Sequence, residues 1–429
     1  MTTLLLGQTL SFSANPWQVP VDDAVQHVRR GAVLIDGGLI RAVGPADDLK
    51  TKYPEAKITD YGDHLIIAGF IDSHAHFSQT AIIASWGKRL IDWLNTYTFP
   101  EETRFHDAKY AAQVAETYLD LNLSNGITTA CAYCTIHPES VDAYFTAAQK
   151  RGLRMMGGKV MMDRNAPDGL RDTAQSGYDD SKALLRKWHG KDRLSYVITP
   201  RFAPTSTETQ LEATGALWAQ FPDCLMQTHL SEQSEEIAWV RDLFPDQQDY
   251  LAVYEHFGLT GPGAVLGHSI YLSDREWSAI RDGGSSLAHC PTSNAFIGSG
   301  LFNATKAHEM KIPTGLATDV GGGSSFSMLR TMASAYEIGQ LRGDALHPAQ
   351  LLWMATQGSA DALHVGNKIG NLVAGREADI VVIDMASTPV IEQRVKRAED
   401  FWEQIFPTIM LGDDRAISAV WVNGSNRAD

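Results

Sequence analysis

The sequence predicts an α/β fold: a (β/α)8 TIM-type barrel with a small β-sandwich domain formed by both termini. The middle of the 429-residue chain alternates short apolar runs with helix-like stretches eight times. Several of these runs are continuous, which is typical of parallel strands buried on both faces. Both ends of the chain instead hold short strand-like runs broken by glycine. The expected boundaries are 1–68 for the N-terminal part of the β domain, 69–365 for the barrel and 366–429 for the C-terminal part.

The β domain is predicted from strand-like runs at both ends and from one hairpin signal. Asp36-Gly37-Gly38 is typical of a tight turn between two antiparallel strands. The expected strands are Thr3–Leu6, Ala32–Ile35, Leu39–Val43 and His64–Ala68, followed near the C-terminus by Ala378–Asp384 and Ala416–Val422. Because neither end has enough apolar sequence for a core of its own, we expect the two ends to fold together.

The barrel strands are predicted from the apolar runs of the middle region. They are expected at Phe70–His74, Ile127–Ala132, Arg154–Met162, Leu194–Thr199, Cys224–Thr228, Ala264–His268, Ser285–Ala288 and Ile312–Thr318. Helix-like stretches, such as 107–123, 138–151 and 233–243, lie between most of them. Eight such repeats fit a barrel of about 250 residues with insertions. A doubly wound parallel sheet is the structural alternative.

Composition and charge restrict the class of function. The chain has 36 basic and 51 acidic residues, a formal net charge of −15. Such a charge disfavours binding to nucleic acid and to anionic membrane surfaces. No apolar run reaches the roughly 18 residues that span a bilayer, and the first residues do not resemble a signal peptide. Four cysteines do not form a disulfide framework, so we expect a cytoplasmic protein.

Metal-competent side chains stand at the ends of four predicted barrel strands. In such barrels, catalytic groups come from the C-terminal ends of different strands. His74 and His76 are two residues apart on the first strand and therefore point to the same face. The fifth strand ends near His229, the sixth at His268 and the eighth near Asp319. Three neutral imidazoles and a carboxylate suit zinc or ferrous iron, so the sequence predicts a catalytic metal site.

Glu232 lies three residues after His229 and admits two interpretations. By itself it is an acid in the first turn of a helix, near the capping residues Ser231 and Ser234. Beside a metal ligand, the same carboxylate can take a proton from water and deliver it to a leaving group. We therefore predict that Glu232 is catalytic.

Three other motifs are rejected as catalytic signals. Cys131-x-x-Cys134 has metal-binding spacing, but residues i and i+3 of a strand face opposite sides and no second cysteine pair exists. His137-Pro138-Glu139 matches half of a zinc-deaminase motif whose Pro-Cys-x-x-Cys half does not follow it. The Gly321–Gly323 run lacks the residues of a phosphate loop and is expected to let the backbone pass close to the site.

With these residues in place, the chain resembles the amidohydrolase superfamily. The resemblance covers the barrel, the histidines, Asp319 and the β domain, and includes the return segment 370–381. Two-metal members usually bridge their ions with a carboxylated lysine on the fourth strand. The corresponding run here, Leu194–Arg201, has no lysine, and Lys159 lies on the third strand. The pattern is therefore similar to the mononuclear deaminases.

Within those deaminases the chain resembles the guanine deaminase family. Three stretches carry this likeness: 70–79, 90–102, and 199–204 together with 228–232. The resemblance implies hydrolytic deamination of guanine to xanthine and ammonia, in purine catabolism or salvage. It also implies one Zn²⁺ per chain, with Fe²⁺ possible, a small purine base as the binding partner, and a homodimer.

The resemblance also assigns roles to individual residues. It implies that zinc is held by His74, His76, His229 and Asp319. The implied catalytic groups are Glu232, His268 and Asp319. The implied contacts to the purine come from Gln79 and Arg201 at its polar edges and from Phe202 on its ring, with His76, His229 and Glu232 also facing it. Water would attack C2, and Glu232 would protonate the ring nitrogen and assist the departure of ammonia.

Two rival functions remain open at this point. One is a deaminase of the same scaffold that acts on 8-oxoguanine, a pterin, cytosine or a triazine. The other is a non-catalytic member that uses the barrel as a binding module. Such a member would be expected to have lost metal ligands, whereas all four ligands and Glu232 are present here.

Overall fold

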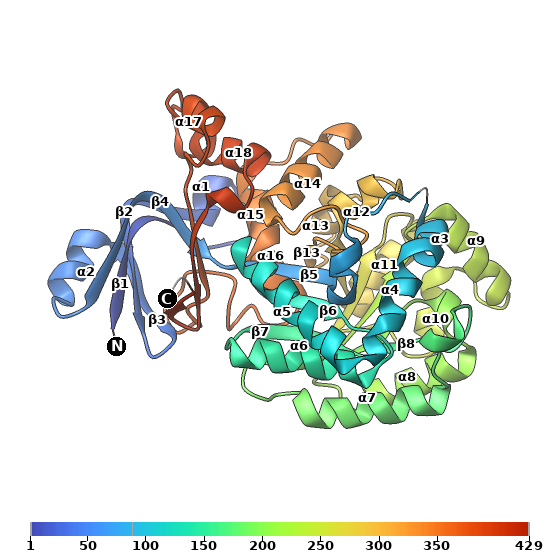
Figure 1. The fold of residues 1–429 in the computed structure, drawn as a ribbon. Coiled ribbons are helices and arrows are strands. Elements are labelled where there is room, and N and C mark those ends of the chain that lie inside the picture. The colour runs from blue at the N-terminus through green and yellow to red at the C-terminus, as the bar shows by residue number, and fades with distance from the viewer. Residues whose placement is uncertain (1, 88, 428–429) are drawn as a thin grey trace. The chain divides into compact units, whose positions relative to one another are not determined.

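The computed structural model describes residues 2–87 and 89–427. It confirms the predicted fold class, with a barrel of parallel strands and a separate sheet built from both ends of the chain (Figure 1). The chain divides into two compact units. One comprises Met1–Asp72, Leu121–Thr129 and Phe326–Asp429, and the other comprises Ser73–Asp120 and Ala130–Ser325.

The barrel strands follow one another in chain order, which excludes the doubly wound alternative. In the described residues the order is β5, β6, β7, β9, β10, β11, β12, β13. Their bounds are β5 (Phe70–His76), β6 (Ile127–Tyr133), β7 (Arg154–Gly158), β9 (Ser195–Pro200), β10 (Leu225–Leu230), β11 (Ala264–His268), β12 (Ser286–His289) and β13 (Thr314–Leu316). Each predicted barrel run therefore overlaps an observed strand.

The third predicted run, Arg154–Met162, is broken into two strands. β7 ends at Gly158, and the short β8 (Val160–Met161) pairs with β9 beyond the break. A Cβ atom on Gly158 would lie 1.8 Å from the carbonyl oxygen of Val197. Glycine thus allows the chain to approach β9 closely and to change direction there.

Backbone hydrogen bonds join the chain after β13 to the end of β5. The amide of Asp319 donates to the carbonyl of His74 over 3.0 Å, and the amide of His76 donates to the carbonyl of Val320 over 2.8 Å. The side-chain hydroxyl of Ser73 adds a hydrogen bond to the carbonyl of Leu316. These bonds link the first and last barrel strands at the end where the candidate site lies.

Helices follow most of the barrel strands, as the alternating pattern predicts. The α-helices between β5 and β13 are α3 (Leu90–Trp93), α4 (Phe99–Thr103), α5 (Ala108–Ser124), α6 (Pro138–Lys150), α7 (Ala174–Trp188), α8 (Glu208–Gln220), α9 (Ser234–Leu243), α10 (Tyr250–His256), α11 (Asp274–Gly283), α12 (Pro291–Phe296) and α13 (Ala304–Glu309). A 3-10 turn, η1 (Phe77–Ile82), follows β5. Within the described ranges, no helix is long and apolar enough to cross a membrane.

Strands from both ends of the chain form one seven-stranded sheet in the described residues, in the order β16-β15-β14-β4-β1-β2-β3. Their bounds are β1 (Thr3–Phe12), β2 (Val25–Asp36), β3 (Leu39–Pro45), β4 (Lys57–Ala68), β14 (Ile380–Ile383), β15 (Ile417–Val422) and β16 (Ser425–Asn426). The same unit contains α1 (Val21–Ala24), α2 (Ala46–Lys52), α14 (Met328–Arg342), α15 (Pro348–Ala355), α16 (Gln357–Ala362), α17 (Pro389–Val395) and α18 (Phe401–Leu411).

This sheet has an apolar core on each face, because side chains alternate along a strand. Leu5 belongs to a cluster with residues of β14 and β15, whereas Leu4 and Leu6 belong to a second cluster that includes Leu49 of α2. The sheet curls, since the amide of Ile40 in β3 donates to the carbonyl of Arg376, just before β14. The two ends of the chain therefore share one folded core.

Candidate metal and active site

Five of the predicted side chains reach one place from four barrel strands. His74 and His76 are on β5, His229 is on β10, and His268 is the last residue of β11. The strand register pairs Leu230 with His268 and His229 with Gly267. Asp319 follows β13 and is held beside β5 by its backbone bond to His74. The strand-end rule therefore brings together residues that are far apart in the sequence.

The donor atoms are spaced as a single metal ion requires. Nε2 of His76 lies 3.2 Å from Nε2 of His229. Oδ1 of Asp319 lies 3.4 Å from Nε2 of His74 and 3.5 Å from Nε2 of His76. In a tetrahedral zinc site with bonds of about 2.0–2.1 Å, neighbouring donors are about 3.3 Å apart. The residues present therefore fit a metal ion.

The protonation states of these groups also suit a metal ligand set. Burial, followed by the charges of neighbouring imidazoles, lowers the pKa of His76 and of His229 well below the usual value. Burial likewise lowers the pKa of His74. Burial opposes ionisation of Asp319, but its interaction with His74 and the other nearby imidazoles lowers its pKa to about 2. Neutral imidazoles and an ionised carboxylate are the forms that bind metal ions.

A backbone carbonyl orients one of the imidazoles. Nδ1 of His229 lies 2.7 Å from the carbonyl oxygen of Arg201 and donates to it, because a carbonyl can only accept. The lone pair of His229 is therefore on Nε2, the atom that faces His76. This arrangement of an outer acceptor fixing the tautomer is typical of metal-binding histidines.

The backbone at two site residues adopts a conformation that L-residues rarely use. The φ angles are +63° at His268 and +48° at Asp319. Non-glycine residues in this region store strain of about 1–3 kcal/mol each and occur most often at functional sites. Gly267 permits a further close approach, since a Cβ atom there would lie 2.8 Å from Cε1 of His74.

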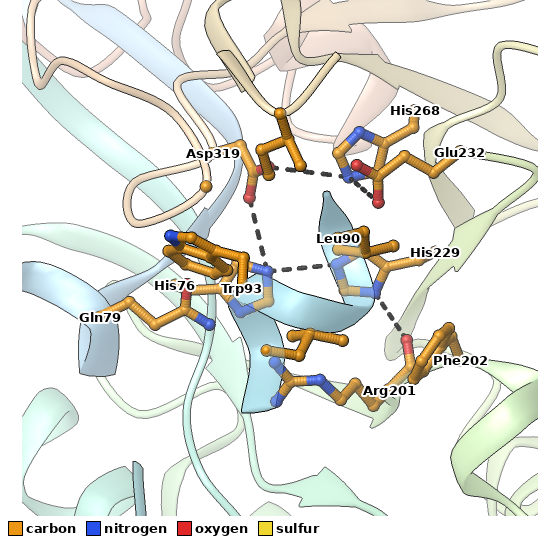
Figure 2. A pocket seen from close by; sticks show the side chains of 13 residues that line it. His76, Gln79, Leu90, Trp93, Arg201, Phe202, His229, Glu232, His268 and Asp319 are labelled. Atoms are coloured by element: carbon orange, nitrogen blue, oxygen red, sulfur yellow. Dashed lines mark hydrogen bonds and ion pairs between the residues drawn. The ribbon is translucent and has the colours of Figure 1, made fainter. Parts of the chain in front are cut away.

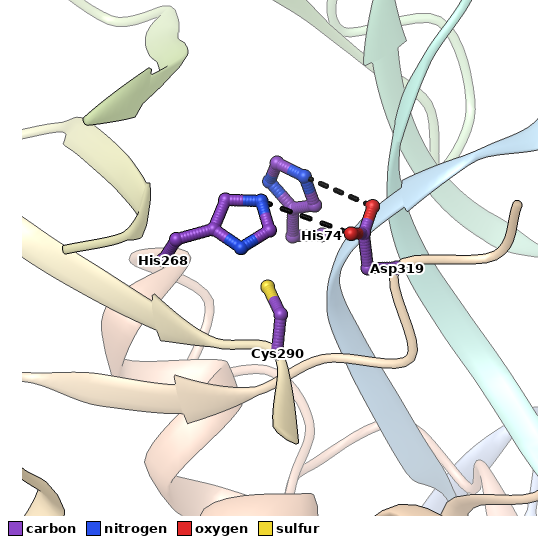
Figure 3. A group of neighbouring side chains, drawn as sticks. All are labelled: His74, His268, Cys290 and Asp319. Carbon is purple, nitrogen blue, oxygen red and sulfur yellow. Dashed lines mark ion pairs between the residues drawn. The ribbon is translucent and has the colours of Figure 1, made fainter. Parts of the chain in front are cut away.

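A cysteine that the sequence analysis did not identify completes a second group of donors. Cys290 follows β12, and its Sγ lies with donor atoms of His74, His268 and Asp319 in a cluster within 4.8 Å (Figure 3). Nε2 of His268 is 3.7 Å from Oδ2 of Asp319. The sequence feature that could have indicated Cys290 is its position directly after a barrel strand.

Glu232 and His268 form an acid–base pair beside the ligand set. Oε2 of Glu232 lies 3.6 Å from Nε2 of His268, and both side chains are almost completely buried. Burial and the charge of Asp319 raise the pKa of Glu232. Burial lowers the pKa of His268, but the carboxylates of Glu232 and Asp319 outweigh it, so that the net shift is upward. An acid with a raised pKa thus lies beside an imidazole with a raised pKa, a combination suited to proton transfer.

Two neighbours fix the orientation of this pair. The hydroxyl of Ser299 donates to Oε1 of Glu232 over 2.8 Å. Nδ1 of His268 lies 2.9 Å from Oδ1 of Asn294. The sequence analysis indicated neither neighbour, because Ser299 lies in the loop after α12 and Asn294, within α12, belongs to no motif. The helix after Glu232 also begins differently from expectation, since the N-cap of α9 is Gln233, which forms a capping box with Glu236.

A pocket adjoins the donor atoms of this group. The predicted substrate residues Gln79, Arg201 and Phe202 line it (Figure 2). The other lining residues are His76, Leu90, Trp93, Leu94, His229, Glu232, His268, Ile297, Asp319 and Gly322. Figure 2 shows Gln79 and Arg201 across the pocket from His268 and Glu232. The pocket thus has one wall of hydrogen-bonding groups and one wall of acid–base groups.

The wall with the hydrogen-bonding groups is organised by a carboxylate that the sequence analysis did not single out. Glu102, in α4, accepts from Nε2 of Gln79 over 2.8 Å and from NH1 of Arg201 over 2.7 Å. The apolar pocket residues Leu90, Trp93 and Leu94 come from the same region of the chain. The stretch 90–102, which carries part of the family resemblance, contains all four residues and was the available signal.

The glycine run after Asp319 lies against this wall, as the sequence analysis expected. A Cβ atom on Gly321 would lie 2.3 Å from Cβ of Gln79. The Cys-x-x-Cys motif has no part in the site: Cys131 is buried and lies 3.2 Å from Oε1 of Gln227. Neither Cys131 nor Cys134 belongs to a candidate metal group of the described residues.

Comparison with known proteins places this chain in a family. Residues 65–426 match the model of the amidohydrolase family, and residues 31–56 match that of a bacterial imidazolonepropionase-like composite domain. Because the first match covers most of the sequence, the chain belongs to the amidohydrolase family.

Its relatives within that family include guanine deaminases. The chain is 42% identical to the guanine deaminase of Escherichia coli K12, over 96% of this chain and 93% of the relative. The crystal structure of guanine deaminase from Bradyrhizobium japonicum matches with a TM-score of 0.97 and 33% identity, covering 100% of this chain and 99% of the other. Guanine deaminase from C. acetobutylicum, with guanine bound in its active site, matches with a TM-score of 0.90 and 29% identity, over 99% and 100% of the two chains.

Proposed function

We propose that this chain is a metal-dependent deaminase that hydrolyses guanine to xanthine and ammonia. One observation carries the proposal: a buried metal-ligand set adjoins an acid–base pair, Glu232 and His268, in a pocket whose opposite wall holds Gln79 and Arg201. The 42% identity to the E. coli guanine deaminase supports the substrate. So does the likeness to a guanine deaminase solved with guanine bound.

The proposed metal ligands are His74, His76, His229 and Asp319, with one zinc ion per chain and ferrous iron as the alternative. The three imidazoles and the carboxylate are donors that both metals accept. When bound, the metal supplies Lewis acidity, which lowers the pKa of a water molecule to about 7.

The protein groups carry the protons. The carboxylate of Glu232 removes a proton from the attacking water, and the oxygen adds to C2 of guanine. Glu232 then delivers that proton to the adjacent ring nitrogen, and a second proton from the hydroxyl group of the adduct passes to the amine, which leaves as ammonia. His268 and Asp319 orient the attacking water through Nε2 and Oδ2, which lie 3.7 Å apart. The raised pKa of Glu232 suits an acid that must hold its proton between these steps.

The remaining pocket residues bind and orient the purine. Gln79 and Arg201 hydrogen-bond its polar edges, because an amide offers an acceptor and a guanidinium offers planar donors. Phe202 packs on the ring, and His76, His229 and Glu232 border the reacting side of the pocket.

The experiment is to measure guanine loss by ultraviolet absorbance and metal content on the same sample. Turnover to xanthine and ammonia with about one zinc per chain is the expected result. A metal-loaded sample that deaminates 8-oxoguanine, a pterin, cytosine or a triazine but not guanine would overturn the substrate. A sample that binds no metal and stays inactive after zinc or iron is added would overturn the deaminase. The homodimer, the cytoplasmic location and the role in purine catabolism stay predictions from the sequence.

A further inference from the structure

We propose that Glu102 determines which edge of a purine the pocket accepts, by fixing the amide orientation of Gln79. This inference rests on the proposed function, because it assumes that Gln79 and Arg201 face a heterocyclic base. Glu102 is a positioning residue in this scheme: it acts through Gln79 and Arg201 and does not contact the substrate.

The three side chains form a closed and buried unit. Their exposed fractions are 1% for Glu102, 2% for Gln79 and 3% for Arg201. Oε1 of Glu102 accepts from Gln79 and Oε2 accepts from Arg201, so each carboxylate oxygen has its own donor. The Glu102–Arg201 contact is an ion pair at 2.7 Å. Burial of such a pair is tolerated when both charges are matched and hydrogen-bonded.

The ionised carboxylate settles the orientation of the Gln79 amide. A carboxylate can only accept hydrogen bonds, whereas an amide has an NH₂ group that donates and an oxygen that accepts. Gln79 must therefore turn its NH₂ group toward Glu102. Its Oε1 is left on the side of Gly321, at the pocket wall. A flipped amide would place two acceptors against each other in a buried site, which is costly.

The pocket therefore presents a fixed polarity. Gln79 offers an acceptor, and the N–H groups of Arg201 that Glu102 does not use offer donors. Because Glu102 neutralises the charge of Arg201, the wall suits an uncharged base. An acceptor beside donors matches a lactam edge, in which a ring N–H adjoins a C=O. The same wall mismatches an amidine edge, in which a bare ring nitrogen adjoins an NH₂ group.

The test is equilibrium binding of hypoxanthine, which has the lactam edge, and adenine, which has the amidine edge, to the metal-loaded full chain by calorimetry. The wild type is expected to prefer hypoxanthine. Glu102→Gln gives Gln79 a partner that can also donate, so the preference should fall at least about tenfold. The matched control is Glu101→Gln on the same helix, because Glu101 accepts from Arg104 and Tyr110 and not from the pocket residues. This control should leave the preference unchanged.

Glu102→Gln leaves the buried Arg201 without its counter-charge and could destabilise the fold. A second variant therefore tests the same inference with the charge retained. Glu102→Asp keeps the negative charge but is too short to reach both partners, so it should also reduce the preference. The inference is overturned if the wild type shows no preference. It is equally overturned if the Glu102 variants weaken both ligands to the same extent, because a purely structural residue would do so.

Turnover separates this inference from the proposed function. Guanine and 2,6-diaminopurine carry the same 2-amino group and differ in the lactam or amidine edge. The ratio of their kcat/KM values should fall with Glu102→Gln by the same factor as the binding preference. A normal binding preference without guanine turnover would overturn the proposed function alone. Guanine turnover with a ratio that Glu102→Gln does not change would overturn the role of Glu102 alone.

Discussion

The carboxylate of Glu232 lies 3.6 Å from the imidazole of His268, and neither side chain is more than a few per cent exposed. His268 lowers the pKa of Glu232 and Glu232 raises the pKa of His268, so each group favours the charged form of the other. Burial opposes both charges. Ser299 and Asn294 hold the two outer ends of the pair, so that its geometry does not depend on a bound ligand.

Glu232→Gln tests the proton transfer directly. The amide keeps the shape and the hydrogen bond from Ser299 but cannot take a proton from water. We expect kcat for guanine to fall about 10²- to 10⁴-fold with unchanged metal content. The matched control is Glu235→Gln, three residues further on, whose side chain is half exposed and paired with Arg89. A Glu232→Gln variant with near-normal kcat would remove Glu232 from the mechanism.

Asp319→Asn tests the ligand set without changing the size of the side chain. The neutral amide loses the charge that the surrounding imidazoles hold in the ionised form, with a pKa of about 2. We expect the variant to be purified with much less than one metal ion per chain. Its activity should fall by more than the loss of metal alone, because Asp319 is also proposed to orient the attacking water. Elemental analysis of wild type and variant prepared together measures the metal content. Full metal occupancy in Asp319→Asn would exclude it as a ligand.

Gly267→Ala tests whether the close approach to His74 is required. The added methyl group would lie 2.8 Å from the His74 ring, so the ring must move or the strand must shift. We expect about 1–3 kcal/mol of destabilisation, the usual range for overpacking, together with weaker metal retention. Gly283→Ala in α11 is the control, because a Cβ atom there meets nothing within 4 Å. That control should stabilise the protein by about 0.5–1 kcal/mol.

His308→Gln tests the acid sensitivity of the fold. Burial lowers the pKa of His308 to about 3, against an ordinary value of 6.5. Below pH 6.5 the unfolded chain binds a proton that the folded chain does not, so the free energy of unfolding falls as the pH decreases from 6.5 to 3. The expected loss for this group is about 2 kcal/mol at pH 5.

Denaturant unfolding at pH 7 and pH 5 checks this sign. A glutamine side chain does not titrate, so the substitution should reduce the difference between the two pH values. His256→Gln, at an exposed position, serves as the control and should leave the difference as it is in the wild type. An identical pH dependence in the wild type and in His308→Gln would contradict the prediction.

The sequence predicts the barrel and the main donors because both follow from local periodicity. A strand end is visible as the end of an apolar run, and parallel strands place all such ends on one side, so His229, His268 and Asp319 could be brought together without a structure. Glu102 could not be assigned in this way. Its partner Arg201 is 99 residues away, and nothing in the spacing of either residue indicates the contact.

Local sequence patterns do not predict where every strand begins or ends. β2 begins at Val25, well before the predicted start at Ala32. The sequence analysis missed the added residues because they are mostly polar, only partly buried and form no continuous apolar run. The break in the third barrel strand at Gly158 depends on the carbonyl of Val197 on the neighbouring strand. Both features are properties of tertiary packing, which a single sequence does not display.

The hydrogen bonds between the first and last barrel strands have a consequence for the order of assembly. Ser73 and Leu316 are separated by 243 residues, and the donors around His74 and Asp319 meet only where this loop closes. In a nascent chain the imidazoles therefore stay apart from Asp319 until nearly three quarters of the length of the chain has emerged. Because closing so long a loop has a high entropic cost, this group of donor side chains should be among the last features to form. Metal uptake would then report on the completed barrel.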